Sequence, residues 1–390
     1  ALDHQNDLSQ SGIVIIGSGL AGFTVIRELR KLDKTIPVIL VTREPGYFYS
    51  KPMLSTALAS NKSAEQLVST NAEGMAAQLE ITIVSDADVT AVDTVTQTIT
   101  TSKGSIPYGK LVLGLGADQI RLPLQGNAVN EVITVNDLEE YAQFRKTIEG
   151  KKRIAILGAG LIGCEFANDL VLGSYEVDVI DLAPQALGRL LPGAAAQALQ
   201  EKLSDAGVRW HFATTVQSID RNADSLTITL ANGSTISSDV FLSAVGLKPR
   251  LDLAKAAGIA TGTGITVNRQ LETSAKNVFA IGDCAEVDGL VLPYVMPIMQ
   301  AARALAPSLL GQVATLSYPA MPVMVKTPSL PTIVSPPAKG AIGDWKITSV
   351  EGGLEARFES SDGKLLGFAL LGSATAQRGA LTKELPPILQ

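Results

Sequence analysis

Residues 13–22 of the chain read IVIIGSGLAG, a run of β-branched apolar residues that leads directly into a G-x-G-x-x-G motif. The apolar run predicts a buried strand, and the glycines predict a tight turn into a helix. Gly17 makes the turn, Gly19 leaves room for a phosphate, and Gly22 lets the helix pack close to the strand. The N-terminus of that helix presents N–H groups and partial positive charge to an anion. The stretch therefore predicts a pyrophosphate-binding turn.

The residues after this motif complete a dinucleotide-binding unit. Residues 23–32 have the apolar spacing of an amphipathic helix, and residues 37–42 are predicted to form a second strand. Glu44 stands 22 residues beyond Gly22, where its carboxylate would accept the hydroxyl groups of an adenosine ribose. A lone G-x-G-x-x-G also fits an ordinary strand-to-helix turn, so the helix, strand and acid favour the nucleotide interpretation.

The same pattern returns 141 residues later. Residues 153–163 read RIAILGAGLIG, and a predicted helix through Leu172 and a strand over 177–180 follow, ending at Asp181. The glycines of this second motif are Gly158, Gly160 and Gly163. The separation is too large for one Rossmann unit and predicts two nucleotide-binding domains. Asp181 would bind a ribose diol and repel a 2′-phosphate, so the second site is expected to prefer NADH to NADPH.

Composition bounds the class of protein. The chain has 390 residues, of which 46% are hydrophobic and 18% charged, enough core for two or three domains. A net charge of −6 argues against nucleic acid as the main partner. Residues 1–11 lack Lys and Arg, so we expect no secretory signal and a cytoplasmic protein. Residues 304–325 carry no charge but contain three prolines and a glycine, which favours a buried helix and turn over membrane insertion.

Cysteine and histidine are scarce. Cys164 and Cys284 stand 120 positions apart, and the sequence has neither C-x-x-C nor C-x4-C, which excludes a cysteine-ligated iron–sulfur or zinc site. The two histidines are His4 and His211, and the second lies in a predicted strand as an ordinary packed or surface residue. We therefore predict no metal site and no Ser-His-Asp chemistry.

The remaining segments give a coarse outline. An aromatic loop over 47–55 precedes a predicted helical stretch to about residue 79. Further strands are predicted at 80–84, 89–92, 96–101 and 110–117. From Tyr318 the chain is rich in proline, and strand patterns follow at 345–350, 354–359 and 365–371. These last strands predict a small sheet domain.

Four further stretches join the two glycine motifs in carrying a family resemblance: 49–55 (YSKPMLS), 160–166 (GLIGCEF), 280–285 (AIGDCA) and 321–328 (MPVMVKTP). With them the chain resembles the FAD-dependent pyridine-nucleotide reductases with two dinucleotide domains, over essentially its whole length. Within that family it is most similar to members that reduce rubredoxin. The resemblance implies an α/β fold with two Rossmann-like domains, for FAD and for NAD, and a small α+β C-terminal interface domain. Residues 1–115 and 245–316 would form the FAD domain, 116–244 the inserted NAD domain, and 317–390 the interface domain.

The resemblance also implies cofactor contacts. Thr42 to Glu44 would lie beside the FAD ribose and Val89 beside the adenine, while Asp283 would hold the ribityl chain and Val295 would border the isoalloxazine. The full set of implied cofactor-binding residues is Gly17, Ser18, Gly19, Leu20, Ala21, Gly22, Thr42, Arg43, Glu44, Lys51, Val89, Gly158, Gly160, Gly163, Glu165, Asp181, Gly246, Asp283, Val295 and Lys326.

Two residues are implied to be catalytic. The resemblance places Lys51 and Glu165 together beside the flavin and nicotinamide rings, where Lys51 would donate toward flavin N5 and Glu165 would orient it. A solvated loop lysine and a surface helix glutamate are the alternatives. Lys326, flanked by Pro322 and Pro328, would face the docking partner, or would be an exposed lysine without a role. The segment from Tyr318 has seven Lys or Arg against six Asp or Glu, a balance of +1, which leaves −7 for the remainder.

Two departures from the family patterns bear on the acceptor. Disulfide reductases of this kind carry a redox cysteine pair in the loop that here spans 47–55 without a cysteine, so electrons would leave for an external acceptor. Ferredoxin reductases usually carry a Trp-Ser-Asp-Gln-like stretch where this chain has residues 325–328, VKTP, which favours rubredoxin. The resemblance implies that NADH reduces FAD, and that FAD reduces two acidic rubredoxins, which would feed an alkane hydroxylase. A ferredoxin reductase, an NADH oxidase or an NADH-responsive interaction protein are the alternatives.

Overall fold

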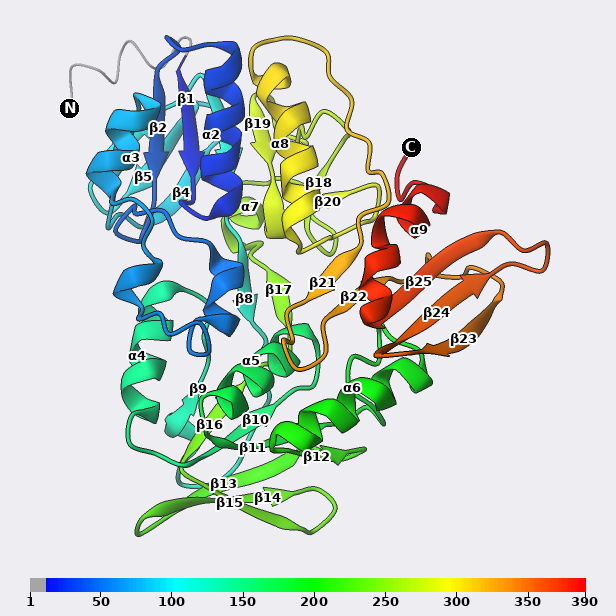
Figure 1. Ribbon diagram of the computed structural model, residues 1–390. Coiled ribbons are helices and arrows are strands. Elements are labelled where there is room, and N and C mark those ends of the chain that lie inside the picture. The colour runs from blue at the N-terminus through cyan, green and yellow to red at the C-terminus, as the bar shows by residue number, and fades with distance from the viewer. Residues whose placement is uncertain (1–11) are drawn as a thin grey trace. The chain divides into compact units, whose positions relative to one another are not determined.

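The computed structural model describes residues 12–390 (Figure 1). Residues 1–11, for which we predicted no secretory signal and which include His4, lie outside the described residues. The chain groups into two compact units. Unit 1 contains the described residues up to Lys51, Val68–Asp118 and Leu247–Tyr318, and unit 2 contains Pro52–Leu67, Gln119–Gly246 and Pro319–Gln390. The domain boundaries predicted at residues 115, 244 and 316 remain a prediction.

Unit 1 is built on a parallel five-stranded sheet. Its strands, in spatial order, are β19 (Val278–Ala280), β7 (Lys110–Leu113), β1 (Ile13–Ile16), β2 (Val38–Val41) and β3 (Thr82–Val84). The central strand β1 is buried along its whole length because it pairs with β2 on one side and β7 on the other. Helix α2 (Leu20–Leu32) follows β1 directly, as predicted, and packs beside α8 (Val295–Leu309) (Figure 1).

Smaller elements complete unit 1. An antiparallel sheet follows α3 (Ala72–Leu79) and β3, and its strands are β4 (Val89–Asp93), β5 (Thr98–Thr101) and β6 (Gly104–Pro107). The other short elements are β17 (Leu247–Pro249), α7 (Asp252–Ala256), β18 (Ile265–Val267), η4 (Gly282–Cys284) and β20 (Ala285–Val287), and the chain passes from unit 1 to unit 2 within the short strand β8 (Ala117–Gln119).

Unit 2 contains a second parallel sheet of the same kind. Its strands, in spatial order, are β12 (Val208–Phe212), β11 (Glu176–Asp181), β10 (Arg153–Leu157), β16 (Val240–Ser243) and β9 (Val132–Ile133). Its helices are α4 (Leu138–Ile148), α5 (Leu161–Leu172) and α6 (Gly193–Ala206), and η3 (Val129–Glu131) precedes β9. A hairpin sheet of β13 (Val216–Asn222), β14 (Ser225–Leu230) and β15 (Thr235–Ser238) shares one apolar cluster with the parallel sheet. The repeat predicted from the glycine motifs is thus a repeat of structure.

The C-terminal part of unit 2 is an antiparallel sheet. Its strands, in spatial order, are β21 (Val323–Val325), β22 (Thr332–Ser335), β25 (Leu365–Gly372), β24 (Gly353–Glu359) and β23 (Asp344–Val350). Two short helices close it, η5 (Ser373–Gln377) and α9 (Arg378–Glu384), and Leu381 packs on Phe368 in their shared core. The predicted α/β fold with a small C-terminal sheet domain is confirmed.

Two expectations about helices need correction. The stretch after residue 55, predicted to be helical up to residue 79, forms only η2 (Glu65–Leu67) and α3, and the predicted loop over 47–55 contains most of a 3-10 helix, η1 (Lys51–Thr56). The helix expected within 304–325 begins earlier, as α8, and ends at Leu309, because Gly311 adopts a φ of +79° beyond its end. Among the residues that the structure describes, no helix is both long and apolar enough to cross a membrane.

Candidate active site

The first glycine turn has the geometry that a pyrophosphate needs. Gly17 adopts a φ of +113°, and a Cβ there would clash with the carbonyl oxygen of Gly114. A Cβ on Gly22 would clash with the carbonyl oxygen of Gly17, so helix and turn require glycine at both positions. At Gly19, the N-cap of α2, a Cβ would meet nothing within 4 Å. The space in front of the helix N-terminus is therefore accessible to an anion, and the turn fits the pyrophosphate of FAD.

The polar residues around this turn lie together at the end of β2. The Ser18 and Thr42 hydroxyl oxygens are 2.7 Å apart, and the Ser18 hydroxyl also donates to a Glu44 carboxylate oxygen at 3.5 Å. The Thr42 hydroxyl accepts the Glu44 backbone N–H at 3.1 Å, and the Tyr49 hydroxyl donates to the Glu44 carboxylate at 3.4 Å. Glu44 is thus fixed beside the glycine turn, where a ribose diol could bind. Arg43, which lies between Thr42 and Glu44 in the sequence, is exposed.

The remaining residues predicted to contact FAD are distributed over unit 1. Asp283 lies in η4, directly after β19, and a Cβ on its neighbour Gly282 would lie 2.9 Å from the Cβ of Ala21 at the start of α2. Burial raises the pKa of the Asp283 carboxyl, and the charge of Lys51 lowers it in part. Val89 is half-buried in β4, and Val295 is exposed as the first residue of α8. Their roles toward FAD remain predictions.

The second glycine turn repeats the geometry of the first. Gly158 adopts a φ of +116°, and a Cβ there would clash with the carbonyl oxygen of Ala244. Gly163 packs on the carbonyl of Gly158, whereas a Cβ on Gly160, the N-cap of α5, would meet nothing within 4 Å. Gly246 follows β16 with a φ of +121°. This turn fits the pyrophosphate of NADH in the same way.

Asp181 closes this turn from the end of β11. One carboxylate oxygen accepts the backbone N–H of Ala159 at 2.6 Å, and the other accepts the N–H of Ala183 at 2.8 Å. Ala159 is a residue of the glycine turn itself. The negative charge of Asp181 is therefore held beside the turn, as its predicted role toward ribose requires.

Glu165 is fully buried in α5 and binds two partners within unit 2. The Ser55 hydroxyl donates to it at 2.9 Å. Lys326 donates twice, from its backbone N–H at 2.7 Å and from its Nζ at 3.1 and 3.2 Å. The surface-residue alternative for Glu165 is therefore wrong, and Lys326 is an ion-paired residue. The predicted approach of Lys51 to Glu165 joins residues of different units and remains a prediction.

Two buried neighbours of Glu165 were missed from the sequence. The Asn168 side chain exchanges two hydrogen bonds with Ser329, donating to its hydroxyl at 2.7 Å and accepting its backbone N–H at 3.1 Å. The Asp169 carboxylate accepts the backbone N–H of Ala59 at 2.8 Å and of Leu58 at 3.1 Å. Burial raises the pKa of Asp169 to about 6, although these N–H groups oppose the shift. The only available signal was three polar residues at helical spacing within an otherwise apolar helix.

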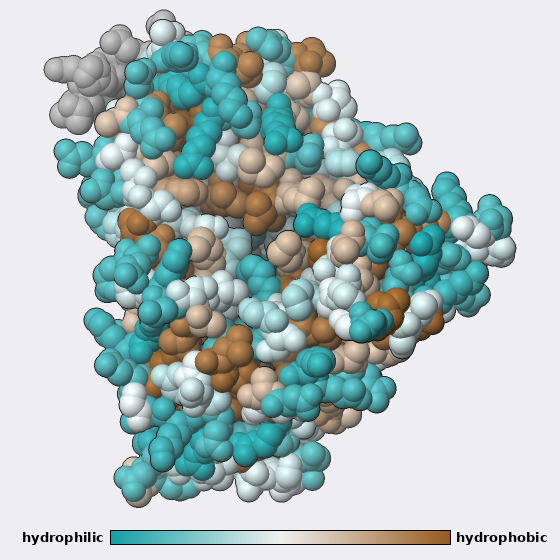
Figure 2. Space-filling model, viewed as in Figure 1, coloured by the Kyte–Doolittle hydropathy of each residue, from teal (hydrophilic) through white to brown (hydrophobic). Residues whose placement is uncertain are grey.

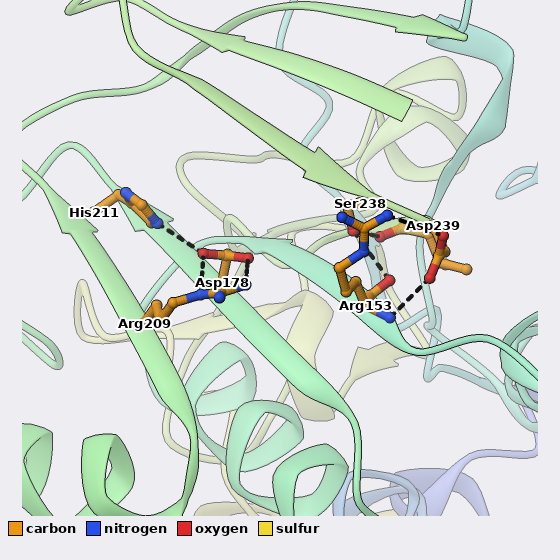
Figure 3. Close-up of polar contacts among 7 residues, drawn as sticks. Arg153, Asp178, Arg209, His211, Ser238 and Asp239 are labelled. Carbon is orange, nitrogen blue, oxygen red and sulfur yellow. Dashed lines mark hydrogen bonds and ion pairs between the residues drawn. The ribbon is translucent and has the colours of Figure 1, made fainter. Parts of the chain in front are cut away.

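The surroundings of the two cysteines and of His211 fit a role in packing rather than in catalysis. Cys164 and Cys284 are free and fully buried, and burial raises the pKa of both thiols, that of Cys284 to about 11. His211 Nε2 lies 2.9 Å from the buried Asp178 carboxylate, which Arg209 also binds (Figure 3). His211 is thus an ordinary, partly buried histidine, as expected from the sequence. Within residues 12–390 no three His, Cys, Asp or Glu side chains gather to hold a metal ion.

Comparison with known proteins adds the family. Residues 11–306 match the model of the pyridine nucleotide-disulphide oxidoreductases, and residues 315–385 match the model of a rubredoxin binding C-terminal domain. The second match covers the antiparallel sheet and the loop that carries Lys326.

Similar proteins span the whole chain. The chain is 45% identical to a rubredoxin-NAD(+) reductase of Alcanivorax borkumensis, over 97% of this chain and 99% of the relative. It is also 45% identical to a rubredoxin-NAD(+) reductase of Acinetobacter baylyi, over 97% of this chain and 98% of the relative. A crystal structure of a ferredoxin reductase from Rhodopseudomonas palustris superimposes with a TM-score of 0.87 at 27% identity, over 97% of this chain and 96% of that one. The chain belongs to the pyridine nucleotide-disulphide oxidoreductase family.

Proposed function

We propose that the chain is an NADH-dependent flavoprotein reductase that passes electrons through FAD to two molecules of rubredoxin. The observation that carries the proposal is the duplicated turn, one copy in each parallel sheet and each with an acid at the end of the neighbouring strand, in a chain that also matches a rubredoxin-binding domain. Two such turns accommodate a donor dinucleotide and a resident one. When bound, FAD supplies the conversion of one hydride into two single-electron transfers.

In unit 1 the residues hold the resident dinucleotide. The N-terminus of α2 would bind the pyrophosphate, and Glu44, fixed by Ser18 and Thr42, would accept the ribose hydroxyls. Asp283 would bind the ribityl hydroxyls, and its raised pKa reflects a site sheltered from water. Lys51 would place positive charge at the flavin ring, stabilising the negative charge that arrives with the hydride.

In unit 2 the residues orient the donor. The N-terminus of α5 would bind the NADH pyrophosphate, and Asp181 would select the ribose without a 2′-phosphate. Glu165 lies one turn further along α5 and binds Lys326, so a lysine of the C-terminal domain is fixed to the helix that would bind NADH. This pair would shape the nicotinamide pocket.

The acceptor is external, because the loop over 47–55 offers no cysteine pair. Rubredoxin is favoured by the match over 315–385 and by the names of the relatives. Ferredoxin is the second candidate, because the similar crystal structure from Rhodopseudomonas palustris is a ferredoxin reductase. We place the reaction in the cytoplasm, where both thiols would stay reduced, and propose an alkane hydroxylase as the enzyme that the rubredoxin supplies.

Steady-state turnover tests the proposed acceptor. The FAD-loaded protein is assayed with NADH and with purified rubredoxin, a ferredoxin or oxygen as the acceptor. We expect kcat/KM for rubredoxin to exceed that for ferredoxin by at least tenfold, and oxygen consumption to be slow. A higher kcat/KM for ferredoxin would make the chain a ferredoxin reductase, and dominant oxygen consumption would make it an oxidase.

A further inference from the structure

One face of α5 carries three buried polar side chains, Glu165, Asn168 and Asp169, which are 0–3% exposed. Their spacing of three and four residues places them along a single stripe of the helix. Burying a carboxylate or an amide costs free energy unless hydrogen bonds compensate. All three are hydrogen-bonded, and their partners come from two segments that are distant in sequence.

The first segment is residues 55–59, which follow Lys51 within and after η1. The Ser55 hydroxyl binds Glu165, and the two successive N–H groups of Leu58 and Ala59 bind the two oxygens of Asp169. A Cβ on Gly173, the C-cap of α5, would clash with the Leu58 side chain. The C-terminal end of the helix therefore also packs closely on this segment. The segment is thus attached to α5 at three points.

The second segment is the loop of residues 326–329 between β21 and β22, which reaches α5 in Figure 1. Lys326 binds Glu165 through both its backbone and its ammonium group, and Ser329 exchanges two hydrogen bonds with Asn168. The Thr327 hydroxyl donates to the carbonyl of Leu330 at 2.9 Å and braces the loop internally. These hydrogen bonds fix the loop to α5 at two residues of the helix, Glu165 and Asn168.

We propose that Asn168 and Asp169 are positioning residues of the reductase: they fix the Lys326 loop and the segment after Lys51 to the helix that begins at the NADH-binding turn. The inference rests on the proposed function, because it assigns these residues to the reduction of flavin by NADH. Each acts through another residue, Asn168 through Ser329 and Asp169 through the N–H groups of Leu58 and Ala59. A displacement of about 1 Å at reacting groups lowers rates by about a hundredfold, so an anchor outside the reacting atoms can control them.

Three substitutions remove the anchors one at a time. Asp169→Asn replaces one acceptor oxygen with a donor that faces a backbone N–H. Asn168→Leu removes both bonds to Ser329, and Ser329→Ala removes one of them from a half-buried residue. Ser329→Ala is the mildest change, so it keeps the test available if Asn168→Leu does not fold.

The chain offers a matched control at Asp239. One of its carboxylate oxygens accepts two successive backbone N–H groups, from Lys152 at 3.1 Å and from Arg153 at 2.9 Å. Its other oxygen lies 3.7 Å from the guanidinium of Arg153 (Figure 3). The two N–H groups lie at the beginning of β10, at the end of the strand away from the glycine turn. Asp239→Asn therefore removes the charge of a carboxylate that binds two backbone N–H groups in the same unit, without touching either segment.

The measurement is anaerobic stopped-flow reduction of the FAD-loaded full chain over a series of NADH concentrations, which separates the limiting rate from the Kd for NADH. Hydrogen exchange of residues 52–61 and 326–330 is followed without NADH. We expect Asp169→Asn and Ser329→Ala to lower the limiting rate about tenfold, to change the Kd less than twofold, and to speed exchange in their own segment. We expect Asp239→Asn to change neither kinetic constant more than twofold. The Asn168→Leu, Ser329→Ala double variant should be no slower than Asn168→Leu.

Three outcomes would overturn the assignment. Faster hydrogen exchange in the two segments with an unchanged limiting rate of flavin reduction would mean that the three side chains only stabilise the structure. An equal loss of rate in Asp239→Asn would trace the effect to general stability. A wild-type protein that NADH does not reduce would refute the proposed function itself, and the positioning role with it.

Discussion

Among single residues, Asp181 has the most direct bearing on the choice of donor. Its carboxylate is held by the N–H groups of Ala159 and Ala183, so it cannot turn away from a 2′-phosphate. We predict that Asp181→Ala narrows the preference for NADH over NADPH by about ten- to hundredfold in kcat/KM. Asp181→Asn, which keeps an acceptor for one N–H but has no charge, separates repulsion from loss of the turn. Comparable use of both dinucleotides by the wild type would show the assignment to be wrong.

Substitution of Lys51 gives a second test at a single residue. Its charge acts on Asp283 within unit 1, and the proposed function places it at the flavin ring. We predict that Lys51→Met slows the reduction of bound flavin by NADH at least about tenfold while FAD stays bound, because the negative charge arriving on the ring would lose the cation that the proposed function places beside it. Stopped-flow absorbance measures the rate, and the flavin-to-protein ratio is the control. Unchanged reduction kinetics would remove Lys51 from the mechanism.

Among the elements, two neighbouring strands at one edge of the second parallel sheet hold a buried carboxylate between two basic side chains. Asp178 in β11 is bound by Arg209 and His211 of β12 (Figure 3). Burial alone would raise the pKa of Asp178, but the hydrogen bonds from His211 and Arg209 outweigh it and lower the pKa. Because the folded-state pKa lies below the unfolded value, the contribution to stability is present above about pH 4 and is lost as the pH falls through the folded-state pKa.

We predict that Asp178→Asn lowers the free energy of unfolding by about 1–3 kcal/mol at pH 7. Arg209 is largely exposed, which keeps the loss below that of a fully buried pair. Urea denaturation at pH 7 and at pH 3.5 measures it, and the difference between variant and wild type should shrink at the lower pH. A difference that is independent of pH would assign the loss to packing.

The elements also show what the sequence could predict. The two strand–turn–helix units were predictable because Gly17 and Gly158 occupy positive φ angles that the turn requires, a local constraint. The start of α8 at Val295 was not predictable from the sequence. The apolar run after residue 304 has no clear period, and Pro297, which usually argues against a helix, is tolerated in the first turn of one. In the site, the position of Glu44 just after the second strand could be predicted from its spacing behind the glycine motif. The partners of Asn168 and Asp169 lie 110 to 161 positions away, and no local pattern indicates them.

For the whole molecule, net charge frames the encounter with the acceptor. The chain carries −6, whereas the segment from Tyr318 carries +1, and mainly hydrophilic residues cover its strands in the view of Figure 2. The sequence favoured Lys326 as the docking cation. In the structure its Nζ lies 3.1 Å from the buried Glu165, so that charge is already balanced, and Lys326→Glu would bring two carboxylates together. Salt dependence is therefore the cleaner test of docking.

We predict that rubredoxin reduction slows steeply with rising ionic strength, because a weak electron-transfer encounter buries little surface and depends on charge. Screening shortens the Debye length from about 10 Å at 0.1 M to about 3 Å at 1 M. The rate of flavin reduction by NADH, measured without rubredoxin at the same salt concentrations, serves as the control. Salt-independent turnover, or an equal loss in both half-reactions, would count against docking on the C-terminal domain.

The most direct test of electron transfer from NADH to rubredoxin is a single-turnover stopped-flow titration. The FAD-loaded protein is reduced anaerobically with one equivalent of NADH and mixed with oxidised rubredoxin, and both chromophores are followed. We predict that two rubredoxins are reduced per NADH, and that this is faster than the reduction of ferredoxin or the consumption of oxygen under the same conditions. A reduced flavin that persists with rubredoxin but is reoxidised quickly by ferredoxin or oxygen would contradict it.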